Sequence, residues 1–165
     1  MSQLPLDDRD LRILAVLSRE GRISKTELAR RVNLSATPCW ERMRRLEAAG
    51  LIRAYHAEVD LARVAPHVVI FVMIELESHR AETFQSFEIA VGRHEEIVAA
   101  WALGGGFDYL LKVVTRDIDS YQRLIDALLA SQLGMRRYFT YVVTKDVKAA
   151  GLPIEALVAA SAAEE

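Results

Sequence analysis

The sequence predicts an α+β protein with two domains, and three observations support this prediction. Residues 6–50 place apolar side chains at helical spacing in three short segments. Residues 67–145 instead alternate between strand-like and helix-like stretches. The charge also divides, since residues 1–66 hold 12 Lys and Arg against 9 Asp and Glu (+3), and the other 99 residues hold 9 against 14 (−5). Two regions with different partners are therefore expected.

The predicted domain boundaries follow these changes in pattern. Apolar residues make up 52% of the chain, which provides for a packed core in each domain. The tail contains the stretch PIEALVAA, which predicts a short helix. We divide the chain into an N-terminal domain with a following strand (1–60), a hinge (61–66), a C-terminal domain (67–148) and a tail (149–165).

The first two predicted helices cover Leu6–Glu20 and Lys25–Val32. Asp7 is suited to cap the first helix, and Gly21 is expected to end it. The second helix starts after Ser24, which opens an S-x-x-E capping box. Both helices are short, and a tight turn separates the second from the helix that follows.

A third helix is predicted over Ser35–Ala49, after a turn in which Asn33 tolerates a positive φ. Ser35 is expected to cap this helix and Gly50 to end it. At about 100° per residue, one face is apolar and should face the core. That core face holds Cys39, Met43 and Leu46, whereas the opposite face holds Thr37, Glu41 and Arg44, with Arg45 and Trp40 on its flanks.

Such an exposed face suits base edges and phosphates in a DNA major groove. The alternative is an ordinary surface helix whose charges are solvated. The capped helix before it, the short turn and the terminal glycine favour a DNA-reading helix-turn-helix. Candidate DNA-binding residues are Ser35, Thr37, Trp40, Glu41, Arg44, Arg45 and Arg53.

Two of these candidates depend on features beside the helix. Leu51–Asp60 alternates loosely and predicts a strand like the one that flanks the reading helix in winged helices, which would bring Arg53 near phosphate. Trp40 has two interpretations, because it either packs at the edge of the small domain or lies against the sugar and backbone of DNA.

Six elements in the C-terminal domain follow the order β-α-β-β-α-β, which is typical of a ferredoxin-like fold. Helices cover one face of such a sheet, and an apolar second face needs a further cover, usually a second copy of the chain. The second helix should point Ile118, Tyr121, Leu124, Ile125 and Leu128 inward. The expected strands are His67–Leu76, Ile97–Leu103, Phe107–Thr115 and Arg136–Lys145, and the expected helices are Ala81–His94 and Ile118–Ser131.

The stretch GGGFDY, Gly104–Tyr109, joins two of these strands and is a candidate ligand site. Three glycines let backbone N–H groups approach a ligand, and Asp108 adds a carboxylate. An α-amino acid needs this pair, since its carboxylate accepts hydrogen bonds and its ammonium donates them. The alternative is a flexible hairpin turn with Asp108 as a cap, and the residues alone favour it.

No catalytic or metal-binding constellation is present in the sequence. Cys39 is the single cysteine, which excludes an internal disulfide and a cysteine-based zinc site and fits a reducing compartment. The four histidines, His56, His67, His79 and His94, lack ligand spacing. Neither a signal peptide nor a membrane span is evident, so we expect a cytoplasmic protein that uses no cofactor or metal and is not an enzyme.

Four blocks occur in an order that resembles the Lrp/AsnC, or feast/famine, family: LDDRDLRIL, ISKTELARRVNLSATPCWERMRRLEAAGLI, GGGFDYLLKV and TYVVTKDVK. The resemblance covers Leu6 to Lys148 and is greatest to the leucine-responsive branch, which shares the S-x-TPC form. It implies a DNA-binding, nucleoid-associated transcriptional regulator of amino-acid metabolism. It also implies a C-terminal ligand-binding (RAM) domain, sheet-mediated homodimers that assemble into octamers, and an amino acid bound between subunits.

The same resemblance implies which residues bind the effector. The ligand loop is Leu103–Tyr109, and a neighbouring chain contributes Thr140 and Tyr141 to the same pocket. The GGG sequence departs from the more polar loop of the leucine-responsive branch, so the resemblance does not identify leucine as the effector. Two alternatives remain, a ligand-independent DNA-organising regulator and a small ferredoxin-like enzyme with a helical appendage. Candidate effector-binding residues are Trp101, Leu103, Gly104, Gly105, Gly106, Asp108, Tyr109, Thr140 and Tyr141.

Overall fold

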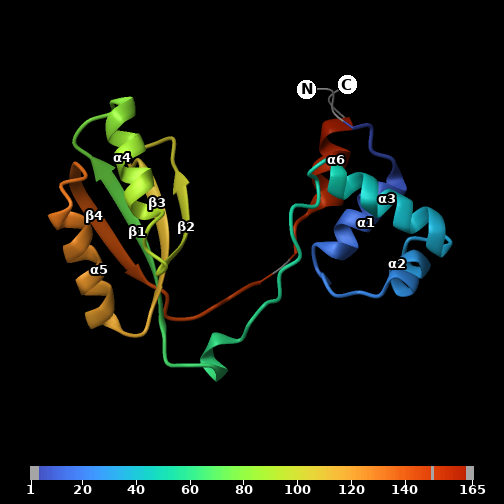
Figure 1. The fold of residues 1–165 in the computed structure, drawn as a ribbon, viewed down its shortest axis with the longest axis horizontal. Helices are drawn as coiled ribbons and strands as arrows, with labels where there is room; N and C mark the ends of the chain where they lie inside the picture. The colour runs from blue at the N-terminus through green and yellow to red at the C-terminus, as the bar shows by residue number, and fades with distance from the viewer. Residues whose placement is uncertain (1–3, 150, 163–165) are drawn as a thin grey trace. The chain divides into compact units, whose positions relative to one another are not determined.

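The computed structural model describes residues 4–149 and 151–162, and these residues form two compact units (Figure 1). The first unit combines the residues up to Val59 with those from Lys148 onwards, and the second is Asp60–Val147. The division between the two units falls after Val59, close to the predicted boundary. The residues predicted as a hinge belong to the second unit, where Leu61–Arg63 forms a short 3-10 helix. The tail belongs to the first unit, where α6 (Ile154–Ala162) lies beside α1 (Asp8–Leu17).

Helix α1 is shorter at both ends than the predicted Leu6–Glu20. Asp7 caps its N-terminus as predicted, and its side chain accepts hydrogen bonds from the amides of Arg9 and Asp10. The helix ends at Ser18, whose hydroxyl donates to the carbonyl of Ala15 at 2.9 Å. Gly21 does not have the left-handed φ expected of a terminating glycine, so its predicted role was wrong.

Helix α2 (Lys25–Arg31) is capped by Ser24, whose hydroxyl accepts the amide of Glu27 at 3.2 Å. The second half of the expected capping box does not form, because the Glu27 carboxylate instead binds Arg30 and Arg31. These hydrogen bonds lower the pKa of Glu27 to about 2. The turn after α2 places Asn33 at a φ of 53°, as predicted.

Helix α3 (Ala36–Ala48) packs through Cys39, Met43 and Leu46, which confirms the predicted core face. Gly50 ends it with a φ of 72°, a conformation that glycine adopts without steric cost. Ser35 occupies the N-cap position but makes no side-chain hydrogen bond to the helix, so its predicted capping bond was wrong.

No strand forms over residues 51–60, so the predicted wing strand was wrong. A strand is stable only when its backbone groups find partners on a neighbouring strand. Within residues 4–149 and 151–162, no backbone hydrogen bond involves an amide or carbonyl of Arg53–Val59. The alternation in this segment therefore reflects composition and not pairing within one chain.

The second unit has the predicted ferredoxin-like order. A four-stranded antiparallel sheet has the order β2-β3-β1-β4, and α4 and α5 both lie on one of its faces (Figure 1). Ile118 is 48% exposed, so its predicted inward position was wrong; it opens α5 at the margin of the buried face. The elements are β1 (Val68–Leu76), α4 (Ala81–Val91), β2 (Ile97–Ala102), β3 (Tyr109–Thr115), α5 (Ile118–Ala130) and β4 (Met135–Val142).

The two faces of this sheet differ in how they are covered. On the helix face, alternate residues of β1 (Ile70, Val72, Ile74) are completely buried against α4 and α5. The opposite face is mostly apolar, no described helix of this unit covers it, and we call it the open face. Strand register places two cross-sheet rows there: Trp101, Leu110, Met73 and Phe139, and Ala99, Lys112, Phe71 and Tyr141.

Candidate DNA-binding and effector sites

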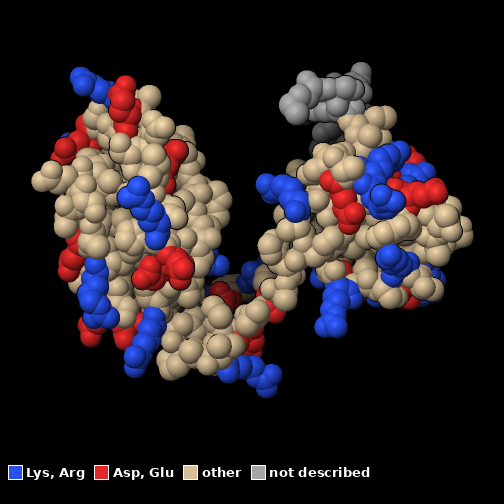
Figure 2. All heavy atoms as spheres, viewed as in Figure 1, with Lys and Arg blue, Asp and Glu red and all other residues tan. Residues whose placement is uncertain are grey.

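The outward face of α3 is available for contacts with another molecule. Thr37, Glu41 and Arg44 are all exposed, as the helical spacing predicts. Among the described residues, none forms a hydrogen bond or ion pair with these three side chains. Figure 2 shows Lys and Arg on the surface of the three-helix unit with acidic groups between them, so this surface is mixed in charge and not uniformly basic.

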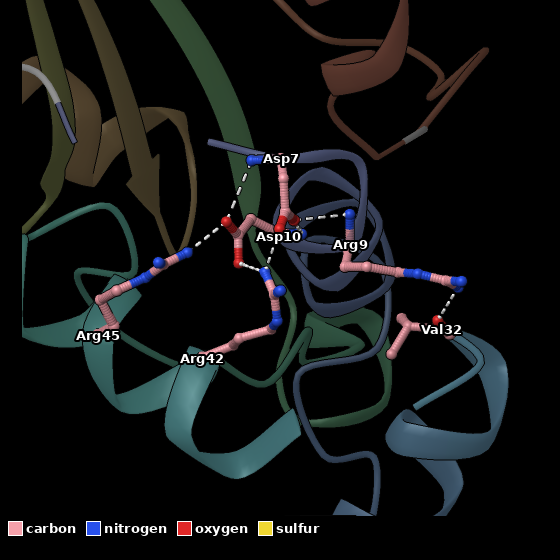
Figure 3. A network of polar contacts seen from close by, with 6 residues as sticks. All are labelled: Asp7, Arg9, Asp10, Val32, Arg42 and Arg45. Atoms are coloured by element: carbon pink, nitrogen blue, oxygen red, sulfur yellow. Dashed lines mark hydrogen bonds and ion pairs between the residues drawn. The ribbon is translucent and has the colours of Figure 1, made fainter. Parts of the chain in front are cut away.

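Arg45 differs from Arg44, because its guanidinium is already bonded within the domain. It donates to the carboxylate of Asp10, a residue of α1 whose side chain is completely buried. Arg42 donates to the other oxygen of Asp10 at 2.9 Å and to Asp7 at 2.6 Å (Figure 3). The role of Arg45 as a DNA contact stays a prediction, and its position on the flank of the outward face is the one expected.

Hydrogen bonds in this network shift the ionisation of its members. The amide of Asp10 and the guanidinium of Arg42 lower the pKa of Asp7 to about 2. The hydrogen bonds to Asp7 and then to Asp10 raise the pKa of Arg42 above its usual value. Sequence reasoning did not identify Asp10 or Arg42 as functional candidates. The one available signal was a second aspartate, three residues after the N-cap, on the core-facing side of α1.

The two remaining aromatic and basic candidates lie at the edge of the same unit. Trp40 is half-buried against the N-terminal core, and the ammonium of Lys25 lies 3.3 Å from the centroid of its ring. Packing at the domain edge, the first of its two interpretations, is therefore what the structure shows. Arg53 is exposed in the segment after α3, and its predicted phosphate contact stays a prediction.

The loop Gly104–Asp108 is held by its last residue. One carboxylate oxygen of Asp108 accepts the amide of Leu76 at 2.7 Å, and the other lies 3.0 Å from Nε2 of His79. Its backbone amide also donates to the carbonyl of Ile74 at 2.9 Å. Asp108 therefore fixes the loop to the end of β1, and its predicted contact with a ligand stays a prediction.

Neither the backbone conformation nor the available space within the chain requires glycine at the three glycine positions of this loop. None has a left-handed φ, and a Cβ added at any of them would meet no atom within 4 Å. Nowhere in the described chain is there an acceptor for the amides of Gly104, Gly105, Gly106 and Phe107. The loop thus presents N–H donors without an acceptor in the described chain, on three exposed glycines and the half-buried Phe107.

The other predicted effector residues divide between the two faces of the sheet. Tyr109 is 3% exposed on the helix face and donates its hydroxyl to Glu88 at 2.8 Å, and burial followed by this bond raises its pKa to about 12. Thr140 lies on the same face, where its hydroxyl bonds that of Tyr121. Trp101 and Tyr141 lie on the open face. Thr140 and Tyr141 therefore point to opposite faces of the sheet, and their predicted contact with an effector at a subunit interface stays a prediction.

A hollow that the sequence did not predict lies between α4 and β2. It has a volume of about 210 Å³ and is lined by Glu88, Tyr109 and apolar residues that include Phe87 and Ile97. No group of three or more His, Cys, Asp or Glu in the described part of the chain could hold a metal ion. None of the described helices is long and apolar enough to cross a bilayer.

Comparison with known proteins identifies both units. Residues 6–53 match the family described as "Winged helix-turn-helix DNA-binding", and residues 69–153 match "Lrp/AsnC ligand binding domain". The chain is 50% identical over 145 residues to the transcriptional regulatory protein DoeX of Halomonas elongata, which covers 88% of this chain and 92% of that protein. It is 41% identical over 143 residues to the leucine-responsive regulatory protein of Escherichia coli, with 87% of each covered.

A solved structure supports the same assignment. A transcriptional regulator from Neisseria meningitidis, in complex with L-Met, matches with a TM-score of 0.84 at 30% identity, covering 93% of this chain and 99% of that one. A helix-turn-helix unit joined to a ligand-binding α+β unit defines a DNA-binding protein with a separate ligand-binding domain. The chain belongs to the Lrp/AsnC family of transcriptional regulators. Its relatives are regulators, which confirms the prediction that it is not an enzyme.

Proposed function

We propose that two copies of the chain pair through the open face of the sheet and present two α3 helices to successive major grooves of DNA. Helix-turn-helix dimers read half-sites that lie about one helical turn apart, or a multiple of it. The observation that carries this proposal is the exposed, unpartnered Arg44 at the centre of the outward face of α3. Arg44 is placed to contact a base edge or phosphate, and Thr37 and Glu41 to adjust sequence preference.

The proposed pairing follows from the composition of the open face. Phe139, Tyr141 and Trp101 are 41%, 51% and 47% exposed there, and Leu110, Met73 and Phe71 continue the same rows. Monomeric proteins rarely leave so continuous an apolar surface in water. A second copy is a suitable cover because the same patch on both chains makes a self-complementary, two-fold interface.

An amino-acid-like effector is proposed at the loop Gly104–Asp108, at an interface between subunits. Its carboxylate would accept hydrogen bonds from the free amides of the loop, and the three glycines leave room for close approach. Asp108 holds the loop in place and puts a negative charge beside the ligand's ammonium group. The relative from Neisseria meningitidis, which forms a complex with L-Met, supports this class of ligand.

The same proposal includes the cellular location, the regulated metabolism and the size of the assembly. We place the protein in the cytoplasm, associated with the nucleoid, as a regulator of amino-acid metabolism. Its dimers would assemble further, to an octamer. The effector would act by binding one assembly more tightly than another, since a ligand shifts an equilibrium only by its difference in affinity.

The DNA-binding part of the proposal is tested with Arg44→Ala. Loss of a contact to a guanine edge should weaken DNA binding by about 1–3 kcal/mol. Fluorescence anisotropy on the upstream DNA of the protein's own gene, and on a duplex selected from a random pool, measures this. Arg116→Ala is a matched control, because Arg116 is also exposed but lies after β3 in the other unit. Binding of Arg44→Ala that equals wild type would remove Arg44 from the residues that read DNA.

The effector part is tested separately by thermal shift with a panel of amino acids. A ligand at a hundred times its Kd should stabilise the folded protein by about 2.7 kcal/mol. Repeating the DNA titration with any stabilising amino acid then measures the coupling. If no amino acid raises the melting temperature, the ligand-independent alternative is favoured.

A further inference from the structure

The three-helix unit contains a buried carboxylate, that of Asp10, which the proposed DNA contacts do not use. The side chain of Asp10 in α1 is 0% exposed. Its Oδ1 accepts Arg42 at 2.9 Å, and its Oδ2 accepts Arg45 and the amide of Asp7. A buried carboxylate is tolerated when charged hydrogen-bond donors surround it. Both arginines come from α3, which lies 32 and 35 positions further along the chain.

The first turn of α1 thereby contacts both other helices of the unit. Arg42 of α3 also reaches Asp7 at 2.6 Å, and Arg9 donates to the carbonyl of Val32, at the end of α2, at 2.6 Å (Figure 3). Arg42 and Arg45 lie three positions apart and so project from neighbouring parts of one helix face. Two fixed points on that face resist rotation of α3 about its own axis.

We propose that Asp10 is a positioning residue for DNA reading. Its carboxylate sets the rotation of α3 and holds Arg42 and Arg45 on the domain, so that Arg44 is the arginine of this helix that contacts DNA. This inference rests on the proposed role of α3 as the reading helix. It changes the predicted division of work, in which Arg44 and Arg45 share the contacts.

The physical reason is competition for one guanidinium. Arg45 donates from Nη2 to the buried carboxylate of Asp10, and this bond fixes where its guanidinium lies. Moving the guanidinium out to a phosphate would leave Asp10 with one arginine in place of two. A buried charge that loses a partner is strongly unfavourable, whereas a phosphate contact at the surface is screened by salt. Arg44 meets no such competition, because no described residue bonds its side chain.

The salt dependence of DNA binding separates the two arginines. Each phosphate contact contributes about 0.9 to the slope of log affinity against log salt. We expect Arg45→Ala to weaken binding while the slope keeps its wild-type value, measured by anisotropy on a selected duplex. A slope that falls by about 0.9 per protomer in Arg45→Ala would show a direct phosphate contact and overturn the proposal. Arg45→Lys, which keeps the ion pair, should restore the wild-type affinity.

Selectivity gives a second readout, through Asp10→Asn. This change keeps the shape of the side chain but releases two cations, so affinity for a scrambled duplex of equal composition should rise. Because α3 is no longer fixed, the ratio of selected to scrambled affinity should fall about tenfold or more. A merely destabilised domain would instead bind both duplexes more weakly, and a wild-type ratio would contradict the proposal.

Two controls separate a failure of the Asp10 proposal from misfolding and from a failure of the proposed reading face. Circular dichroism shows whether Asp10→Asn folds, and the slope for Arg45→Ala decides the question if it does not. Arg44→Ala is measured on the same duplexes. If Arg44→Ala binds as tightly as wild type, the proposed reading face fails, whatever the Asp10 and Arg45 variants show.

Discussion

Replacing Tyr141 with aspartate tests whether the open face holds two copies of the chain together. Tyr141 lies on β4 beside Phe71 of β1, and its side chain is 51% exposed in the single chain. Complete burial of a large apolar side chain contributes about 1.5–3 kcal/mol, so burying the exposed half contributes about 1 kcal/mol. A symmetric dimer contains this contact twice, which gives about 2 kcal/mol for the pair.

Aspartate adds a second unfavourable contribution at the same position. Each carboxylate would be buried beside Phe71, with Lys112 one strand further along the row, at a cost of about 1 kcal/mol or more. Together with the lost apolar contact, the dimer should be weaker by about 4 kcal/mol, or about a thousandfold in its dissociation constant. Sedimentation equilibrium over a range of protein concentration measures this constant directly.

A matched control separates the interface from general damage. Ile89 of α4 is also 51% exposed but lies on a helix that covers the other face of the sheet. Ile89→Asp should therefore still form dimers. The reasoning would be refuted by Tyr141→Asp molecules that fold as wild type and dissociate with the wild-type constant.

Three further predictions concern stability. Asp108→Ala should lower the free energy of unfolding by about 1–3 kcal/mol, because the amide of Leu76 loses its acceptor; urea denaturation measures this. Gln132→Gly should raise it by about 0.5–1 kcal/mol in the same assay, because Gln132 has a φ of 50°, a conformation that costs L-residues about 1–2 kcal/mol. Asp7 has its pKa lowered from 3.8 to about 2, so the stability it contributes is complete above pH 3.8 and lost as the pH falls toward 2; Asp7→Asn should flatten this loss in melts across that interval.

The features that the sequence predicted well are those that depend on near neighbours. Ser24 caps α2, Asn33 has a positive φ and Gly50 ends α3, and each of these roles follows from a few adjacent residues. The order of strands and helices in the second unit was also predictable. Apolar alternation and helical spacing are local signals that a buried face imposes on every element.

The strand predicted over residues 51–60 was wrong because a strand needs a pairing partner, which is distant in the sequence. Residues 51–60 alternate as a strand does, yet no partner strand exists for them in the described chain. The family resemblance assigned Thr140 and Tyr141 to one pocket, and adjacent residues of a strand point to opposite faces. Their faces became clear only from pairing with β1, opposite Val72 and Phe71. Register is a long-range property, so a motif match alone does not supply it.

The ion pairs of Asp10 were also not predictable from the sequence, because its partners lie far along the chain. By helical spacing it belongs with Ile13 on the buried side of α1, where an unpaired carboxylate would normally argue against a packed helix. It is stable there only because two arginines arrive from more than thirty residues away. Breaking such a buried pair typically costs about 3–5 kcal/mol, more than an exposed ion pair contributes. A charge at a core position of a short helix therefore indicates a remote partner of opposite charge, and here that partner is α3, the helix that we propose reads DNA.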